Sequence, residues 1–590
     1  MARAPKNSEQ NESTAPLDVS PAKSFYLGLL FDELLFPFPK YDPAEEETLR
    51  IVLDSVDKFL EPKHEEFRRY DVEGAQPDEY LESLKELGLF GLIIPEEYGG
   101  IGFSNAAYAR VLQQSSRYDA STSLTVGAHS SIGMKGVLLF GNEQQKKAYL
   151  PRLASGELIA AFCLTEAGSG SDAASIKTKA EQNSDGSWTL NGEKIWITNG
   201  ATAGLFTVFA RTDSEAGKLS AFIVERQWDG VSTGPKEDKM GIRASATTTV
   251  SFNNVRIPQE NLLGEVGKGF KIAMEILNNG RTGLGGGCVG GMKRCIDLAV
   301  AQATNRKQFG KSIAEFGLIK EKIAQMTVAC FATESVVRMV AGLIDSGRTD
   351  YSVEAAISKI YATESLWSVV NEALQIAGGN GFMREYPYER VVRDSRINMI
   401  FEGTNEILRL YVALSGLKEA GDYLKDLSSS VGKILNDPIK GFGVLSGYAT
   451  KKFSQYTSLG RQELQHCHPA LKDLGVVYEQ YALALSREAE VLLRRHGKAV
   501  IEEQFAMKRL AEVTVDLFVG LSVLSRVSSL IEQKGIDACQ QERAIAEVFT
   551  NQAKRRMNQN LRRIEKNEDE QLISLADAVV ADGRYRWDTF

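Results

Sequence analysis

The chain has 590 residues, a formal net charge of −8 and a sequence pI near 5.6. A single hydrophobic core does not extend over this length, so we expect about three or four domains. The acidic balance leaves no basic surplus to neutralise phosphates, which argues against nucleic acid as the main partner. The six cysteines form no CxxC pair and His466-Cys467-His468 has no second ligand cluster, so we expect a reducing compartment, no disulfide frame and no structural metal.

Residues 1–41 combine a polar start with a short apolar segment. The polar start is rich in Ser, Asn, Pro and Glu, which is typical of a flexible tail, and its acidic residues argue against a transit peptide. No hydrophobic run of a signal peptide follows a basic start. The apolar stretch Phe25–Phe38 is too short to span a bilayer, so we expect it to pack on the body. These features predict a cytoplasmic location, or the mitochondrial matrix in a eukaryote.

Residues 42–160 show charged and apolar residues recurring at three and four positions, which predicts an α-helical domain. Within it, Gly133 and Gly136 lie one turn apart on one helix face. Two missing side chains indicate either a close crossing with another element or a widened cavity. Close crossing is the commoner cause.

Residues 161–265 change period and carry short β-rich runs, such as Lys194–Thr198 and Leu205–Ala210, separated by Asp-Gly and Asn-Gly turns. This pattern predicts a compact antiparallel β domain. Its entry, from Phe162 to Asp172, is a strand followed by a glycine-rich loop whose N–H groups and hydroxyls could hold a polar ligand. It lacks the GxGxxG dinucleotide fingerprint, and an ordinary turn explains it equally well.

Residues 266–420 return to helical patterning. Seven glycines lie between Gly280 and Gly291 inside a predicted helix, and each costs about 1 kcal/mol relative to alanine. Neighbouring packing must therefore compensate. The breaks Asn305–Gly310 and Gln375–Phe382 are polar and glycine-rich, as helix caps and turns also are.

The stretch Ile397–Leu410 delivers one carboxylate to the start of a helix. Glu402 stands between an apolar run and a Gly-Thr-Asn turn, a setting that removes water from a carboxylate and raises its pKa toward that of a general base. Thr404 or Asn405 can cap the helix that follows. An ordinary turn with a capped helix explains the same residues, so these residues alone leave both interpretations open.

Residues 421–465 form a glycine- and serine-punctuated linker with apolar residues three apart among lysines. Such an amphipathic segment is a candidate for contact with a membrane surface, or packs on the body. Residues 466–590 predict a separate α-helical domain with an apolar stripe on one helix, made of Val477, Tyr481, Leu485, Ala489 and Leu492.

Five motifs, in this order and at these distances, resemble the acyl-CoA dehydrogenases: Phe162–Asp172, Lys194–Gly200, Arg306–Gly310, Gln375–Phe382 and Phe401–Asn405. The resemblance covers about residues 45–420, and the C-terminal domain resembles that of the very-long-chain branch. It implies a mainly α fold with a central β domain, in which an α-helical domain, an antiparallel β domain and a four-helix-type α domain precede the additional C-terminal α-helical domain.

The resemblance also implies FAD as cofactor and assigns it residues by position. These are Phe162, Leu164, Thr165, Ser171, Trp196 and Thr198 near the flavin, Thr404 and Glu406 beside the base, and, from the partner subunit, Arg306, Gln308, Phe309, Phe316, Gln375 and Gly379 at the pyrophosphate and adenosine end. Arginine suits this task because its fork meets phosphate oxygens two at a time.

For the substrate, the resemblance implies a long-chain acyl-CoA that contacts Ser171, Asn278, Arg281 and Gly403, with Gly133 and Gly136 at the floor of the acyl cavity. Glu402 would be the catalytic base, and its backbone N–H would polarise the thioester carbonyl. The product would be trans-2-enoyl-CoA, in the first step of β-oxidation. The resemblance further implies a homodimer, peripheral membrane contact and an electron-transfer flavoprotein as electron acceptor.

Gly280 occupies the position where some relatives carry the base, so Glu402 has no competitor there. Ala167 stands where the family usually has proline, and the glycine run from Gly280 is usually richer in alanine, which leaves the shape of the acyl tunnel open. Two other functions fit the same motifs: an acyl-CoA oxidase that uses molecular oxygen, and an assembly or scaffold protein of a respiratory complex that retains the fold.

Overall fold

The computed structural model describes residues 18–212, 218–436 and 463–589, and side chains are described up to residue 422 in α14 (Asn405–Asn436). The chain divides into two compact units: a larger unit, Phe38–Leu408, and a smaller unit made of residues 1–37 and 409–590. Most of the predicted amphipathic linker, residues 437–462, lies outside the described residues.

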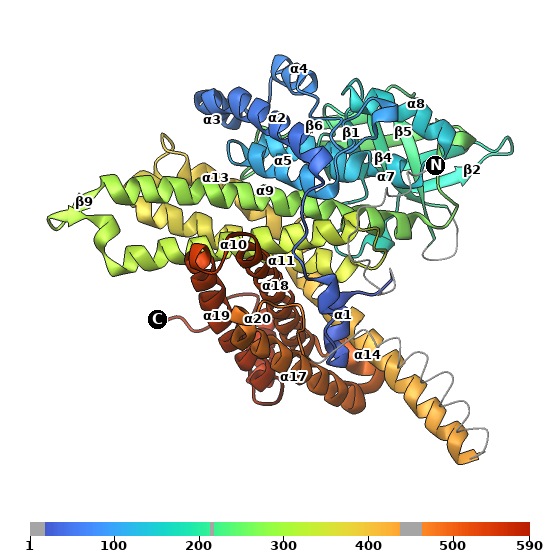
Figure 1. The fold of residues 1–590 in the computed structure, drawn as a ribbon. Coiled ribbons are helices and arrows are strands. Elements are labelled where there is room, and N and C mark those ends of the chain that lie inside the picture. The colour runs from blue at the N-terminus through green and yellow to red at the C-terminus, as the bar shows by residue number, and fades with distance from the viewer. Residues whose placement is uncertain (1–17, 213–217, 437–462, 590) are drawn as a thin grey trace. The chain divides into compact units, whose positions relative to one another are not determined.

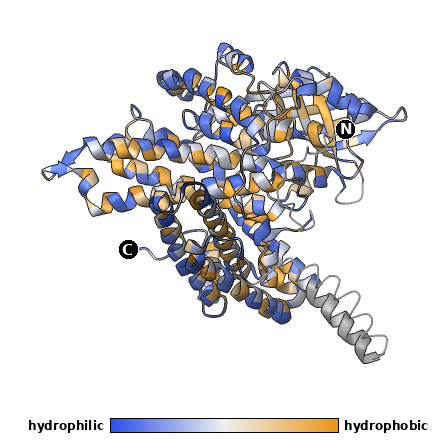
Figure 2. Ribbon diagram, viewed as in Figure 1, coloured by the Kyte–Doolittle hydropathy of each residue, from blue (hydrophilic) through white to orange (hydrophobic). Residues whose placement is uncertain are grey.

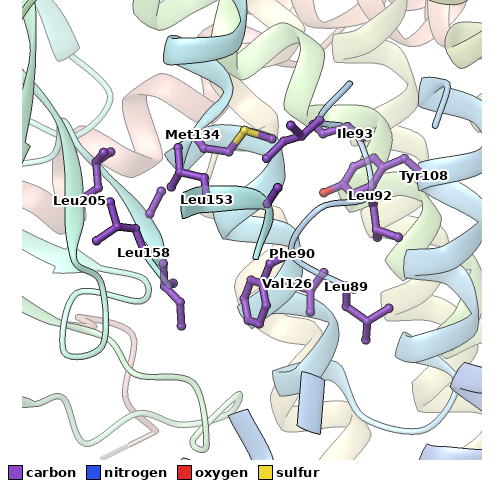
Figure 3. Close-up of a cluster of buried hydrophobic side chains, with 14 of the residues drawn as sticks. Leu89, Phe90, Leu92, Ile93, Tyr108, Val126, Met134, Leu153, Leu158 and Leu205 are labelled. Atoms are coloured by element: carbon purple, nitrogen blue, oxygen red, sulfur yellow. The ribbon is translucent and has the colours of Figure 1, made fainter. Parts of the chain in front are cut away.

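The larger unit begins with helices that enclose an apolar core (Figure 3). They are α2 (Pro43–Leu60), α3 (His64–Glu73), α4 (Asp78–Glu86), α5 (Asn105–Ser116), α6 (Ala120–Ala128), α7 (Lys135–Phe140) and α8 (Glu143–Ala154). Ser104, Asp119 and Asn142 cap α5, α6 and α8 by accepting backbone N–H groups. Leu89, Phe90 and Leu153 are among its buried side chains (Figure 3).

A π-helical turn, His129–Gly133, joins α6 to α7 and packs on the first strand. The backbone N–H of Ala160 donates to His129 Nδ1 at 3.0 Å, and burial lowers the pKa of His129 to about 4, so this imidazole is a neutral acceptor. A Cβ on Gly133 would lie 2.6 Å from the Ala160 carbonyl oxygen, and one on Gly136 would lie 2.9 Å from the Leu263 side chain. Close packing therefore accounts for both glycines without a cavity.

The central sheet has the strand order β6-β7-β3-β2-β4-β5-β8, with β1 paired to β4. The pairs are antiparallel except β1–β4 and β2–β4, which are parallel. Many residues of its strands are hydrophobic (Figure 2), and they form a buried cluster. The bounds are β1 (Ala160–Cys163), β2 (Lys179–Gln182), β3 (Trp188–Ile197), β4 (Leu205–Arg211), β5 (Leu219–Glu225), β6 (Val231–Lys236), β7 (Thr248–Ile257) and β8 (Leu262–Leu263).

Three long helices follow and pack on one another: α9 (Gly269–Asn305), α10 (Gly317–Asp345) and α11 (Ser352–Ala377). The seven glycines between Gly280 and Gly291 all lie in α9, as predicted. A Cβ on Gly286 would lie 3.0 Å from the carbonyl carbon of Ala109 in α5, and one on Gly290 would overlap the carbonyl oxygen of Gln113. The backbone of α5 approaches α9 closely at these glycines. This close packing is the compensation that the sequence requires for the low helix propensity of glycine.

The remaining elements of the larger unit are short. The hairpin β9 (Lys307–Gln308) and β10 (Lys311–Ser312) joins α9 to α10 and lies at the end of these helices away from the central sheet (Figure 1). Helices α12 (Gly379–Phe382) and α13 (Tyr388–Ser395) then lead to Glu402 and to α14, which runs through the predicted domain boundary at residues 420 and 421.

The smaller unit contains α1 (Pro21–Ser24), α17 (Lys472–His496), α18 (Gln504–Lys534), α19 (Gln540–Glu565) and α20 (Asp569–Asp582). Phe25, Tyr26 and Leu35 are buried in it, and Thr514 Oγ1 of α18 donates to Tyr26 Oη at 3.0 Å. On α17 the buried stripe runs through Tyr478 and Ala482 rather than the predicted Val477 and Tyr481. Both α10 and α18 are long and apolar enough to cross a membrane, but 61% and 89% of their apolar windows are buried inside the protein.

Candidate active site

Glu402 lies on a strained turn at the entrance to α14. The φ angles of Glu402 and Gly403 are +54° and +92°, and the positive value at a non-glycine residue has an energetic cost. Thr404 Oγ1 accepts the backbone N–H of Ile407 at 3.3 Å and so caps α14, one of the two capping alternatives that the sequence allows. The turn therefore places Glu402 directly before the start of α14.

The Glu402 carboxylate is enclosed although the residue as a whole is partly exposed. Its Oε2 atom is buried and finds no hydrogen-bond partner among the described residues. Burial raises the pKa of Glu402, and the positive charges of Arg281 and Lys359 oppose this rise. A desolvated carboxylate with an unused oxygen is the electrostatic setting of a general base.

Two of the predicted substrate residues meet this turn from α9. Arg281 Nη2 donates to the backbone oxygen of Glu402 at 3.4 Å, and Arg281 Nη1 donates to Asn278 Oδ1. A Cβ on Gly403 would lie 3.8 Å from Arg281 Nη2. The structure therefore brings Glu402, Gly403, Arg281 and Asn278 together from positions more than a hundred residues apart in sequence. Gly280 lies nearby in α9, where a Cβ would meet Ser131 and Ile132.

Lys359 also reaches this turn, and sequence reasoning missed it. Its Nζ atom donates to the Gly403 carbonyl oxygen and to Asn405 Oδ1, both at 2.8 Å. The side chain is fully buried in α11. The sequence signal is weak: Lys359 stands in the largely apolar segment Val353–Ile360, which also holds Glu354, and a charge buried there requires a partner.

The predicted flavin-facing residues cluster where β1 and β3 meet. The backbone N–H of Ile195 donates to the Thr165 carbonyl at 3.0 Å and ties the two segments together. Trp196 has a positive φ of 57° and is 64% exposed, while Leu164 is buried and Phe162 packs 4.9 Å from Phe209. An exposed tryptophan held on a rigid strand forms an apolar platform for a planar ligand. Thr198, the remaining member, is partly buried beside them.

The loop after β1 is anchored at its base and open at its tip. Glu166 pairs with the buried Lys194 at 2.7 Å and accepts the backbone N–H groups of Lys177 and Thr178. No described atom lies within 4 Å of a Cβ built on Gly168 or Gly170. Ser171 is exposed on the same loop. This open backbone fits a polar ligand such as a phosphate or a flavin edge.

Most of the remaining predicted cofactor residues are exposed, whereas Phe316 and Thr404 are partly buried, and most of them lie far from the loop within the larger unit. The hairpin that carries Phe309 lies at the distant end of α9 and α10 (Figure 1). Phe309 is 93% exposed at the hairpin tip, and Phe316 packs at 6.1 Å from it. Gln375 and Gly379, at the end of α11, are also exposed, as are Arg306, Gln308 and Glu406. One chain therefore does not bring the two predicted halves of the FAD site together.

The residues present fit a flavin dinucleotide in chemical type: an aromatic platform at Trp196, open glycine backbone at Gly168 and Gly170, and the exposed guanidinium of Arg306. Open space also surrounds Gly378 and Gly379, where no described atom lies within 4 Å of a built Cβ. These features support the predicted cofactor without fixing its position.

Comparisons with known proteins agree with this architecture. Models of the acyl-CoA dehydrogenase N-terminal, middle and C-terminal domains match residues 45–157, 161–255 and 267–417, and the model described as "ACAD9/ACADV, C-terminal domain" matches residues 469–585. A very long-chain specific acyl-CoA dehydrogenase from Macaca fascicularis is 44% identical over 92% of this chain and 83% of its own length.

Solved structures are similar as well. An acyl-CoA dehydrogenase complexed with FAD from Bacillus anthracis is 34% identical, with a TM-score of 0.78 and coverage of 96% of both chains. Butyryl-CoA dehydrogenase from Megasphaera elsdenii is 37% identical, with a TM-score of 0.61, and covers 63% of this chain and 98% of its own. These findings confirm the predicted fold class, including the additional C-terminal domain, and the chain belongs to the acyl-CoA dehydrogenase family of FAD-dependent enzymes.

Proposed function

We propose that this protein dehydrogenates long-chain fatty acyl-CoA to trans-2-enoyl-CoA in the first step of fatty acid β-oxidation. The observation that carries the proposal is the enclosed Glu402 carboxylate, whose pKa burial raises, on a turn held at positive φ. Family membership supplies the reaction class, and the very long-chain relative supports the long-chain substrate.

Glu402 would remove the proton from the carbon next to the thioester. That proton is a weak acid in water, so its removal needs a base of matched proton affinity and a donor to the thioester oxygen. Burial raises the pKa of Glu402, and the positive charges of Arg281 and Lys359 oppose this rise and favour the ionised form. The backbone N–H of Glu402 would donate to the thioester oxygen. FAD, when bound, supplies the acceptor for the hydride that leaves the β-carbon.

A homodimer would complete the cofactor site. Trp196 and the loop Glu166–Asp172 of one subunit would meet Arg306, Phe309 and Gln375 of the partner subunit. The separation of these groups within one chain supports the proposal (Figure 1). So does the 93% exposure of Phe309, because a large apolar side chain that is exposed to solvent often marks a binding surface. The hairpin tip and the end of α11 would then be partner-facing surfaces.

Electrons would leave through an electron-transfer flavoprotein, and the relatives support the mitochondrial matrix as the location if the source is eukaryotic. The proposed peripheral membrane contact rests on residues 421–465, most of which lie outside the described residues. Sedimentation of the protein with anionic liposomes, before and after deletion of residues 437–462, tests that contact. Equal sedimentation of both forms would contradict it.

The acyl-chain preference is the most specific part of the proposal. Gly133 and Gly136 are explained by close packing on Ala160 and Leu263, and their role at the cavity floor stays a prediction. If the prediction holds, Gly136→Ala should shorten the preferred chain, because the added methyl group would take up space at the cavity floor. It would also lie 2.9 Å from the Leu263 side chain and 3.2 Å from Ile276 Cδ1. An unchanged preference with a normal flavin content would place the acyl chain elsewhere.

The reaction is tested by anaerobic titration of the purified flavoprotein with acyl-CoAs from butyryl to stearoyl. We expect bleaching of the flavin by palmitoyl-CoA, with weaker bleaching by short chains. Protein that binds FAD but is not bleached by any of them would contradict the dehydrogenase and favour the scaffold function. Hydrogen peroxide formed in step with turnover in air would favour the oxidase.

A further inference from the structure

Lys359 is a fully buried lysine whose ammonium group ends at the turn that carries Glu402. It donates to the Gly403 carbonyl and to Asn405 Oδ1, each at 2.8 Å. Gly403 and Asn405 flank the cap residue of α14, so one cation binds both sides of the bend. A turn with two successive positive φ angles persists only where its surroundings hold it.

Asn405 extends this anchor into α11. Its Nδ2 atom donates to Thr363 Oγ1 and to Glu364 Oε1, each at 3.0 Å. Its side chain is therefore fully committed to α11, which explains why Thr404, and not Asn405, caps α14. Lys359 and Asn405 together fasten the first residue of α14 and the Gly403 carbonyl to a rigid helix.

Charged and titratable groups lie near Lys359 on α9, on its own helix α11 and on the turn that carries Glu402. Arg281 and Cys288 face it from α9, Glu364 from its own helix, and Glu402 from the turn, while Tyr108 of α5 lies near Glu402. Burial lowers the pKa of Lys359 to about 8, which leaves the amine protonated at neutral pH. The ammonium group and the Glu402 carboxylate are thus both buried and interact electrostatically, in a setting where a charge interaction is stronger than in water.

We propose that Lys359 is a positioning residue for catalysis: its ammonium group fixes the Glu402–Gly403 turn through the Gly403 carbonyl and supplies positive charge that favours the ionised form of the adjacent carboxylate. The inference rests on the proposed role of Glu402 as the base. It predicts that Lys359 acts on the base and on the chemical step, with little effect on the affinity for acyl-CoA. A lysine that only joined two helices would affect folding and flavin content instead.

The test compares the holoenzyme with Lys359→Met, which removes donor and charge, and Lys359→Gln, which keeps an N–H donor for the carbonyl and removes the charge. Single-turnover flavin reduction by palmitoyl-CoA is followed from pH 5.5 to 9. Lys239→Met is the matched control, because Lys239 is partly buried, its pKa is also lowered to about 8, and it donates at 2.9 Å to Ser245 O, away from Glu402.

We expect both Lys359 variants to move the acidic limb of the rate profile upward by about one pH unit or more, with the rate at pH 7 at least about tenfold lower and KM for palmitoyl-CoA changed less than about threefold. Lys239→Met should leave the limb in place. An unmoved limb in both Lys359 variants, or loss of flavin from both, would overturn the inference. Glu402→Gln separates the two proposals: if it keeps a near-normal rate, the base assignment itself fails.

Discussion

Alanine at two neighbouring glycines of α9 should change stability in opposite directions. A Cβ on Gly290 would overlap the carbonyl oxygen of Gln113 and lie 3.0 Å from its carbonyl carbon. A Cβ on Gly287 would meet only Ser123 Oγ at 3.7 Å and Ser116 at 3.9 Å, which is ordinary contact. Both variants gain about 1 kcal/mol of helix propensity.

The difference lies in what the methyl group meets. At Gly290 it meets the backbone of α5, which cannot rotate away, so the helices must separate, at a cost of about 3 kcal/mol. Gly290→Ala should therefore lose about 2 kcal/mol after the propensity gain, whereas Gly287→Ala should gain up to about 1 kcal/mol. The expected gap between the two variants is about 3 kcal/mol.

The assay is the apparent melting temperature of the holoenzyme by scanning calorimetry, at one scan rate and equal flavin content, because a protein of several domains does not unfold in two states. We expect the order Gly290→Ala below wild type and Gly287→Ala at or above it. Equal melting temperatures for the two variants, or a more stable Gly290→Ala, would refute the close approach of α5 to α9.

Three further predictions follow from other parts of the structure. Lys194→Met should lower the melting temperature and release FAD, because it leaves the Glu166 carboxylate buried without its cation, at a cost of about 3–5 kcal/mol; the exposed Lys179→Met should change neither, and equal behaviour of the two variants would contradict this account. Deletion of residues 421–590 alone should cause aggregation, because it exposes the buried Tyr26. A chain that also lacks residues 1–37 should stay soluble, as size-exclusion chromatography would show. Aggregation of the second chain but not of the first would count against the two-unit division. Flavin reduction should fall as pH decreases through the raised pKa of Glu402, and therefore at a higher pH than for an ordinary glutamate, in stopped-flow measurements; a rate that is constant down to pH 5 would argue against a buried base.

Sequence reasoning reached the fold class and the Glu402 turn because both rest on local signals. The change from helical to β period marks the central sheet, and the Gly-Thr-Asn sequence after Glu402 marks a turn. The sequence shows the glycines of α9, but it does not show that α5 packs against them. α5 lies more than a hundred residues away in the chain, and its backbone leaves no room for a side chain at Gly286 or Gly290. On α17 the predicted stripe was right at Leu485, Ala489 and Leu492. In the first half of the helix, however, the buried residues are Tyr478 and Ala482, one position beyond Val477 and Tyr481, because apolar residues there occupy more than one side of the helix.

Lys359 shows why part of the site stayed hidden. Its partners, Gly403 and Asn405, are 44 and 46 residues distant in sequence, and a lone lysine within an apolar helix also occurs where the stem packs and the amine reaches water. Gly133 and Gly136 are a different case. The resemblance assigned them to the cavity floor, which stays a prediction, and close packing on the Ala160 carbonyl and the Leu263 side chain, the cause that the residues alone favoured, also accounts for them.

The central claim is that the enclosed Glu402 carboxylate removes the proton from the substrate. Anaerobic single-turnover reduction of the flavin by palmitoyl-CoA in Glu402→Gln tests it most directly, because glutamine keeps the size of the side chain and loses the base. We predict normal FAD content and acyl-CoA binding with a reduction rate at least about 10³-fold lower. A Glu402→Gln rate within about tenfold of wild type would contradict the account.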